Sequence, residues 1–176
     1  LSSIRMMSDL MTQENTDDKS RSVVFAQKIS ATAKDIAQRM HTIIWSLNAE
    51  NDSVENFAEY VRQYGVSYFE DANIKFDCEI SSEIPANALL SGIQRKNLFL
   101  VSKEAFHNIL KHAGASQVQV NIKTDNGKLC LRIHDNGKGI QNSNLFGNGL
   151  KNMQKRIDEI KGTIEFSSDN GTLVWV

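Results

Sequence analysis

The sequence predicts an α+β fold in which a helical hairpin precedes a two-layer α/β sandwich. Two observations lead to this prediction. Residues 1–50 contain no glycine or proline and place apolar residues at helical spacing. Residues 51–176 instead alternate apolar and polar positions around Asn-Gly turns, which is typical of paired strands. With 176 residues and 40% hydrophobic content, the chain is large enough for a packed domain and a smaller helical element.

The helical hairpin is expected in residues 1–50. Residues 1–11 carry a short apolar stripe, residues 15–20 (NTDDKS) indicate a turn, and a longer stripe follows. The longer stripe alternates spacings of three and four, as in an a/d coiled-coil seam: Ala26, Ile29, Ala33, Ile36, Met40, Ile43 and Leu47. Because two helices with such narrow stripes cannot bury both, we expect a homodimer in which two copies form a four-helix bundle.

The sandwich is expected in residues 51–176. Asp52 with Glu55 resembles a capping box and predicts a helix, whose inward residues are Val54, Phe57, Val61, Tyr64 and Tyr68. The strand that follows has its inward residues at alternate positions: Ile74, Phe76, Cys78 and Ile80. A further helix, including residues 104–114, is predicted after Pro85, the only proline.

Two hairpins complete a predicted sheet of four or five mostly antiparallel strands, with helices on one face. The first hairpin turns at Asn126–Gly127 and the second at Asn170–Gly171. The helix between the hairpins has Leu150, Met153, Ile157 and Ile160 on its inward side. It is expected to end with Gly162 in the C′ position.

Charge and composition exclude several classes of protein. A net charge of -1 and a pI near 6.5 argue against a nucleic-acid-binding protein and against a polybasic membrane anchor. No apolar run approaches the roughly 18 residues of a transmembrane helix, and no signal peptide opens the chain. We therefore expect a cytoplasmic region. Since Leu1 is not methionine, we also expect it to be part of a longer protein, whose other segments would provide any membrane attachment. Cys78 and Cys130 fit no metal spacing and are expected to be reduced core residues.

Residues 135–150 (DNGKGIQNSNLFGNGL) combine an acidic residue with closely spaced glycines. Taken alone, DNGKG is more often an ordinary turn after a strand, and GNGL is equally often a plain junction between a loop and a helix, so the segment points to a nucleotide only together with the other motifs. Asp135 ends a predicted strand, and its carboxylate suits recognition of an exocyclic amine such as N6 of adenine. Gly137 and Gly139 let the backbone approach a ring and allow positive φ angles. Gly147 and Gly149 precede a helix N-terminus, where free N–H groups favour phosphate.

Residues 104–114 (EAFHNILKHAG) add polar groups along one edge of a helix. At about 100° per residue, Glu104, Asn108, Lys111 and His112 fall within an arc of roughly 100° beside the apolar face. Asn108 offers a neutral oxygen to a Mg²⁺ that also keeps waters and phosphate oxygens, and Lys111 is placed to meet phosphate charge. Together with the loop, this edge predicts a site for a nucleoside triphosphate.

The order of these motifs resembles that of a known family. Residues 97–176 resemble the ATP-binding domain of two-component sensor histidine kinases, within the superfamily of gyrase, Hsp90, histidine kinases and MutL. EAFHNILKHA is similar to the N box, DNGKGI to the first glycine box and GNGLKNM to the second. GT, at residues 171–172, is similar to the last conserved element.

The resemblance implies a Bergerat-type ATP-binding fold. It also implies that Asn108 binds Mg²⁺, that Lys111 lies near phosphate, and that Asp135 binds the adenine amino group with support from Thr172. Leu150 belongs to the second glycine box and is expected at the nucleotide site. Two roles stay open: Glu104 acts as a general base or orients Asn108 or Lys111, and His112 touches phosphate or packs against the lid.

Two further stretches resemble the NarX/DesK-type subgroup. Residues 141–146 correspond to an unusually short ATP lid. IRMMSDL and RMHTIIWSLNAENDS are similar to parts of that subgroup's dimerisation and phosphoacceptor domain. Family members carry the phosphoaccepting histidine near the start of the first helix. Since no histidine precedes His41, which is expected to be a solvated helix residue, the acceptor is expected upstream of Leu1.

The resemblance implies transfer of the ATP γ-phosphoryl to that histidine and then to an aspartate of a response regulator receiver domain. Residues 48–53 are the expected hinge between bundle and ATP-binding domain. One alternative is an anti-sigma-factor-like serine kinase acting as a binding switch, against which the long seam argues. Another is an interaction module with a vestigial ATP site, against which the intact motifs argue. A gyrase-type hydrolase would need a transducer domain, for which the chain has no room.

Overall fold

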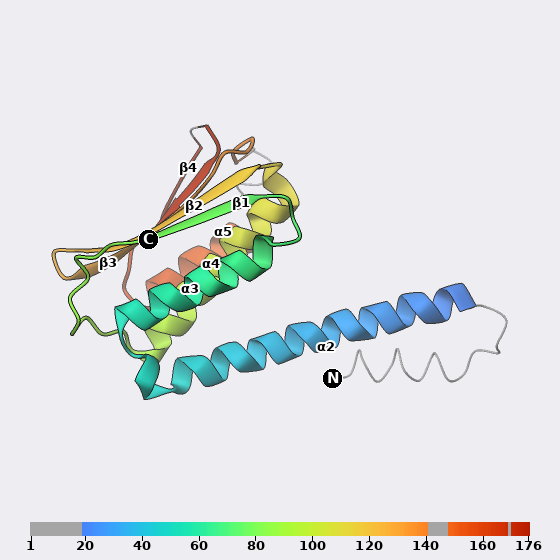
Figure 1. The fold of residues 1–176 in the computed structure, drawn as a ribbon, viewed down its shortest axis with the longest axis horizontal. Helices are drawn as coiled ribbons and strands as arrows, with labels where there is room; N and C mark the ends of the chain where they lie inside the picture. The colour runs from blue at the N-terminus through green and yellow to red at the C-terminus, as the bar shows by residue number, and fades with distance from the viewer. Residues whose placement is uncertain (1–18, 141–147, 169) are drawn as a thin grey trace. The chain divides into compact units, whose positions relative to one another are not determined.

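The computed structural model describes residues 19–140, 148–168 and 170–176 (Figure 1). The chain divides into an N-terminal unit, Leu1–Leu47, and a C-terminal unit, Asn48–Val176. None of the helices within the described ranges is long and apolar enough to span a membrane.

The described part of the N-terminal unit is the helix α2 (Lys19–Leu47). The predicted stripe at residues 1–11 lies outside the described residues, as does most of the predicted turn, whose last two residues belong to α2. The predicted seam runs along α2, and two of its side chains, Met40 and Ile43, are 57% and 47% exposed in the single chain. Ile44, outside the predicted seam, is 65% exposed, so the apolar surface of α2 is wider than the seam.

Among the described residues, the C-terminal unit has a five-stranded sheet in the order β1-β2-β3-β5-β4. The strands are β1 (Lys75–Ile80), β2 (Gln117–Asp125), β3 (Lys128–Asp135), β4 (Glu165–Ser168) and β5 (Thr172–Trp175). β1 pairs with β2 in parallel, and the other neighbours pair antiparallel. The predicted mostly antiparallel sheet is therefore confirmed.

Both predicted Asn-Gly turns are present. Asn126 and Gly127 join β2 to β3 with φ angles of 49° and 74°. Asn170 and Gly171 lie between β4 and β5 with φ angles of 50° and 128°. In the two-residue β2–β3 turn, positive φ at both residues matches the twist of the paired strands, and asparagine and glycine adopt it most readily.

Helices cover one face of the sheet, which is the predicted two-layer arrangement (Figure 1). They are α3 (Val54–Phe69), α4 (Gly92–Asn108) and α5 (Asn148–Glu159), with a 3-10 turn η1 (Ala49–Asn51) before α3 and a π-helical turn η2 (Ile109–Ala113) after α4. The strand residues on the covered face are buried: Val118, Val120, Ile122, Leu131, Ile133 and Val174. Polar residues such as Gln119, Asn121, Arg132 and His134 alternate with them and line a groove on the opposite face.

Aromatic rings join α3 and α4 to β1. The ring of Phe106 in α4 is fully buried, and its centroid lies 5.3 Å from that of Phe69 in α3 and 5.6 Å from that of Phe76 in β1. Gly65 makes room for Phe76, because a Cβ on Gly65 would overlap that ring. These contacts fix α4, whose C-terminal end reaches the candidate site.

The predicted N-cap of α3 is wrong by one residue. Ser53 caps the helix, and its Oγ accepts the N–H of Asn56 at 3.0 Å. The predicted cap, Asp52, instead pairs its carboxylate with Arg95 of α4. A partner distant in sequence therefore decides which of the two adjacent residues caps the helix.

The predicted C′ glycine of α5 is also displaced by one residue. The left-handed residue after α5 is Lys161, with a φ of 57°. Its N–H bonds to the carbonyl of Asp158 at 3.0 Å, and that of Gly162 bonds to the carbonyl of Ile157 at 3.0 Å, which is a Schellman motif. Gly162 thus occupies C″, where a Cβ would lie 3.0 Å from Cγ2 of Ile157.

Both cysteines are free thiols, as predicted, and both are half-buried. Burial raises the pKa of the Cys78 thiol to about 11. The thiolate form of Cys78 is therefore strongly disfavoured at neutral pH.

Candidate nucleotide-binding site

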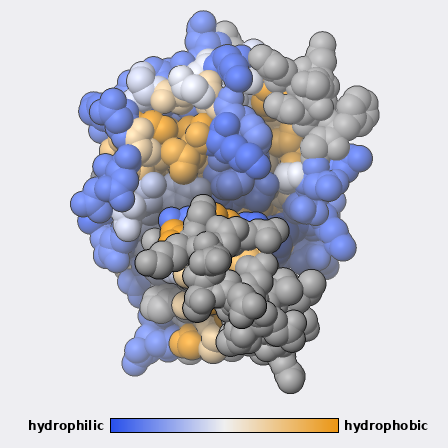
Figure 2. Space-filling view, turned by 90° about the vertical axis from the view of Figure 1, so that its right-hand side faces the viewer, coloured by the Kyte–Doolittle hydropathy of each residue, from blue (hydrophilic) through white to orange (hydrophobic). Residues whose placement is uncertain are grey.

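A cavity of about 280 Å³ opens in the C-terminal unit where α4, η2 and α5 meet the end of β3 and the start of β5. Its apolar lining includes Ala105, Ile109, Ile133, Met153 and Val174. Its polar lining includes Glu104, His107, Asn108, Lys111, His112, Asp135, Asn148 and Thr172. Figure 2 shows a side of the molecule on which apolar and hydrophilic surface lie next to one another. Apolar walls with a few convergent polar groups are typical of small-molecule sites.

A π-helical turn carries the chain of α4 along the cavity. The α-helix ends at Asn108, η2 continues to Ala113, and Gly114 then adopts a left-handed φ of 61°. The sequence predicted continuous α-helical spacing here, and this is wrong for the last turn. The carbonyl of Ala113 accepts the N–H of Lys138 at 3.0 Å, which ties the end of η2 to the loop after β3. Such π-helical turns occur frequently at functional sites.

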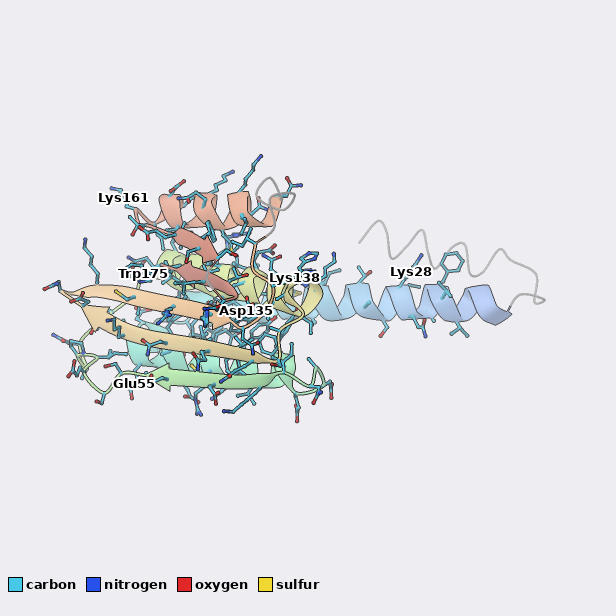
Figure 3. All side chains as sticks on the ribbon, turned by 90° about the horizontal axis from the view of Figure 1, so that it is seen from above. Lys28, Glu55, Asp135, Lys138, Lys161 and Trp175 are labelled. Atoms are coloured by element: carbon cyan, nitrogen blue, oxygen red, sulfur yellow. The ribbon has the colours of Figure 1, made fainter. Side chains whose placement is uncertain are left out.

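Asp135 is the last residue of β3, and its side chain lines the cavity while remaining only 1% exposed. Its Oδ1 accepts the N–H of Gly137 at 2.8 Å. Its Oδ2 is buried and has no hydrogen-bond partner in the described part of the chain. Figure 3 shows Asp135 at this end of the sheet, with Lys138 beyond it in the loop. Because a buried carboxylate oxygen without a donor is costly, this atom fits a ligand that brings an N–H group.

Gly149, in the first turn of α5, lies against two polar side chains of α4. A Cβ on Gly149 would lie 2.5 Å from Oε1 of Glu104 and 3.5 Å from Nδ2 of Asn108. A carboxylate and an amide therefore lie beside a helix N-terminus, whose free N–H groups favour phosphate. Oxygens of these two types are ligands that Mg²⁺ accepts.

The same donor set limits how a metal ion would be held. Across residues 19–140, 148–168 and 170–176, no group of three or more His, Cys, Asp or Glu side chains is able to hold a metal ion. A Mg²⁺ beside Glu104 and Asn108 fits this chain only if nucleotide oxygens and waters supply most of its ligands, which is the usual arrangement for Mg²⁺.

Two side chains that the sequence did not single out hold the glycine loop. Oδ1 of Asn136 accepts the backbone N–H groups of Ser116 and Gln117, both at 2.9 Å. Oγ of Ser168 accepts the N–H of Ile140 at 2.9 Å. These bonds connect the loop after β3 to the start of β2 and to the β4–β5 hairpin. Hydrogen bonds within the protein therefore hold the loop in place.

The structure brings most of the predicted site residues together at one cavity. Those that line it are Glu104, Asn108, Lys111, His112, Asp135, Gly139, Gly149, Leu150 and Thr172. Gly137 is not among the lining residues. It packs against the carbonyl of Ala113, which a Cβ on Gly137 would overlap. Gly147 lies outside the described residues.

Sequence reasoning missed several lining residues. His107 is exposed but lines the cavity, and its Nδ1 lies 3.4 Å from the hydroxyl oxygen of Tyr68. Burial raises the pKa of Tyr68, and the nearby negative charge of Glu104 raises it further. Asn148 was missed because it lies between the two predicted glycines. Met153 was predicted only as an inward residue, because periodicity does not reveal whether an inward residue meets core or cavity.

Residues 93–176 match the family model of histidine kinase-, DNA gyrase B- and HSP90-like ATPases. This segment contains every described residue that lines the cavity. The match covers slightly less than half of the chain. It supports the predicted resemblance to an ATP-binding domain of this kind over residues 93–176.

Curated relatives of the chain include a sensor histidine kinase and a sensor protein. The sensor histidine kinase YvfT of Bacillus subtilis is 24% identical over 176 residues, which cover 99% of this chain and 44% of YvfT. The sensor protein VraS of Staphylococcus epidermidis is 36% identical over 110 residues, which cover 60% of this chain and 31% of VraS. The chain therefore spans less than half the length of either relative.

Solved histidine kinase structures share the fold. The histidine kinase AdeS of Acinetobacter baumannii superposes with a TM-score of 0.64 at 15% sequence identity, covering 99% of this chain and 91% of that chain. At this identity the likeness shows the fold alone. It supports the mixed sheet with helices that was predicted for the ATP-binding part of the chain.

Proposed function

We propose that this chain is the dimerisation and ATP-binding region of a two-component sensor histidine kinase of the NarX/DesK type. Mg-ATP binds in the cavity, and the γ-phosphoryl passes to a histidine expected upstream of Leu1 and then to an aspartate of a response regulator. The observation that carries the proposal is the buried Oδ2 of Asp135, which has no partner among the described residues and lies in the segment that matches the ATPase family model.

In this proposal, Asp135 recognises adenine. Its free oxygen accepts a hydrogen bond from the exocyclic amine, while Oδ1 stays bonded to Gly137. Thr172, which also lines the cavity, supports that contact. The apolar side chains of Ile133 and Met153 provide the surface on which the ring packs.

The triphosphate lies toward α5. Gly149 and Leu150, in the first turn of α5, receive the phosphates, and the sequence predicts the same role for Gly147, which lies outside the described residues. Lys111 and His112, both exposed beside the cavity, supply positive charge. Asn108 provides the protein oxygen for Mg²⁺.

Glu104 either polarises the attacking group or orients Asn108. Phosphoryl transfer needs mainly this kind of positioning and charge neutralisation, because the transferred group requires little covalent help from the protein.

The exposed apolar surface of α2 supports a homodimer through the N-terminal helices, because Met40, Ile43 and Ile44 are left in water in the single chain. The further partner in this proposal is the receiver domain of a response regulator, and nucleic acid is not a partner. The region acts in the cytoplasm, and any membrane attachment of the parent resides in other segments.

The test compares this chain with a longer form of the protein that contains the upstream helix, both given ATP labelled on the γ-phosphate. We expect both to bind Mg-ATP, and only the longer form to acquire label that is stable in base and lost in acid, as phosphohistidine is. Asp135→Asn in the longer form should abolish labelling. ATP binding without labelling of the longer form would contradict the kinase proposal. Acid-stable label on a serine of a partner protein would instead favour the serine kinase, and loss of all binding a vestigial site.

A further inference from the structure

Arg95 is a buried charge far from the candidate nucleotide site. It lies in the first helical turns of α4 and is only 1% exposed, although arginine is rarely buried this fully unless it is paired. It precedes Asn108 by thirteen residues, which places it about 20 Å away along the helix at 1.5 Å per residue. Nucleotide binding therefore does not account for it.

The guanidinium of Arg95 bonds to the chain that enters the C-terminal unit. Nη1 pairs with the carboxylate of Asp52 and donates to the carbonyl of Leu90 at 2.8 Å. Nη2 donates to the carbonyl of Asn48 at 3.2 Å. Asn48 directly follows α2 and is the first residue of the C-terminal unit. One side chain thus holds both ends of residues 48–52 to α4.

Backbone hydrogen bonds hold the same segment to the residues just before α4. The N–H of Leu90 bonds to the carbonyl of Asp52 at 2.7 Å, and the N–H of Val54 bonds to the carbonyl of Ala88 at 2.9 Å. Ser53 and Leu89 form a β-bridge between these bonds. Residues 48–53, which the sequence predicted as the hinge, are therefore bonded to the C-terminal unit throughout.

We propose that Arg95 is a positioning residue that holds residues 48–52 against α4. The flexible joint between the two units then lies at the Leu47–Asn48 junction and not within residues 48–53, where the sequence predicted it. The chain arriving from α2 is then fixed to the same helix that carries Glu104 and Asn108 at its other end. Arginine suits this task because its planar fork of donors reaches several oxygens at once, which a lysine ammonium does not. The proposal does not depend on kinase activity, and its tests need no nucleotide.

Amide hydrogen exchange of the whole chain tests the clamp. In Arg95→Met, we expect exchange in residues 48–56 to accelerate about tenfold or more, because the carbonyl and carboxylate partners lose their donors. Peptides from β2 and β3 should change less than about threefold. Unchanged exchange in residues 48–56, or an equal acceleration over the whole C-terminal unit, would overturn the proposal and make Arg95 an ordinary core residue.

Three further variants keep the test decisive. Asp52→Ala removes the charged partner, whose side chain is 41% exposed, but leaves the carbonyls of Leu90 and Asn48 as acceptors for Arg95, so the same peptides should exchange faster by a smaller factor. Arg95→Lys should restore protection only in part. The matched control is Arg62→Met, since Arg62 pairs with Glu59 at 2.7 Å on the surface of α3, and it should leave residues 48–56 unchanged. An effect of the control equal to that of Arg95→Met would count against the clamp.

The flexibility of the joint can be measured directly from distances between the two units. Spin labels on Val24 of α2 and Gln119 of β2, both exposed, report the spread of distances between the two units once both cysteines are replaced by serine. Arg95→Met should broaden this distribution, because residues 48–53 then become part of the joint. An unaltered distribution would show that the joint never depended on Arg95.

Discussion

Asp135→Asn separates ligand recognition from folding. Asparagine keeps the shape of aspartate and keeps an oxygen for the N–H of Gly137, which lies 2.8 Å from Oδ1 in the native chain. It replaces the unpartnered Oδ2 with an NH₂ group. The substitution therefore turns the one open acceptor of this side chain into a donor.

The expected loss of ATP affinity follows from that exchange. A hydrogen bond to a charged group contributes about 1.5–3 kcal/mol, and an N–H facing the adenine amine adds the cost of an unsatisfied donor. A total of about 2–4 kcal/mol corresponds to a roughly 30- to 1000-fold higher Kd. Stability without ligand should respond differently. Removing a buried charge with an unpartnered oxygen offsets the weaker bond to Gly137, so the free energy of unfolding should change by no more than about 1 kcal/mol.

Calorimetric titration with Mg-ATP and urea unfolding of the same protein samples measure the two effects. The control is Asp77→Asn, because the Asp77 carboxylate bonds to Lys75 at 3.0 Å and Gln117 at 3.2 Å on the polar face of the sheet. It should leave ATP affinity unchanged. A Kd within threefold of wild type for Asp135→Asn would refute the assigned contact. So would a loss of stability above about 2 kcal/mol, since poor binding would then reflect general damage.

Three other changes test separate parts of the structure. Gly137→Ala should weaken ATP binding at least tenfold and destabilise the chain by about 1–3 kcal/mol, because the added Cβ overlaps a carbonyl of η2. Gly127→Ala, whose Cβ would meet nothing within 4 Å, should leave binding unchanged, and equal losses in the two variants would contradict this reasoning. Phe106→Ala should lower the free energy of unfolding in urea by about 3–5 kcal/mol, since the ring is fully buried. A loss below about 1 kcal/mol would show that neighbouring side chains fill the space left by the ring. Cys78 should react with iodoacetamide at pH 8 about 100-fold more slowly in the folded chain than in urea, because a pKa of about 11 lowers its thiolate population. Equal rates would show that the thiol is not held in that environment.

Local patterns were sufficient for the sheet and for most of the candidate site. The strands carry strict alternation, and the Asn126–Gly127 turn requires positive φ angles that few other residues adopt. The loop after Asp135 combines an acceptor with closely spaced glycines, and those residue types have few structural uses together. Sequence reasoning predicted an element correctly where the residues that determine its conformation lie next to one another in the chain.

Two of the errors arose where a residue distant in sequence changes the local outcome. Ser53 rather than Asp52 caps α3, because Asp52 is paired with Arg95, 43 residues away. The helix after Asn108 becomes π-helical, and the carbonyl of Ala113 at its end bonds to the glycine loop. Neither Arg95 nor the π-helical turn has a signature in its own neighbourhood, so only the folded chain reveals them.

Asp135 has a buried carboxylate oxygen without a hydrogen-bond donor in the described part of the chain, which costs stability, and this gives the Asp135 substitution a further consequence. Wild type at a nucleotide concentration of 100 Kd gains about 2.7 kcal/mol of stability through binding. If Asp135→Asn raises the Kd 100-fold, the variant gains only about 0.4 kcal/mol at the same concentration. The variant should therefore lie within about 1 kcal/mol of wild type in unfolding free energy without ATP, and it should gain about 2 kcal/mol less than wild type when ATP is added. Substitution of a residue that serves only the fold would lower the free energy of unfolding by the same amount with and without ATP. Substitution of a residue that contacts the ligand changes mainly the value measured with ATP, so this comparison decides which role Asp135 has.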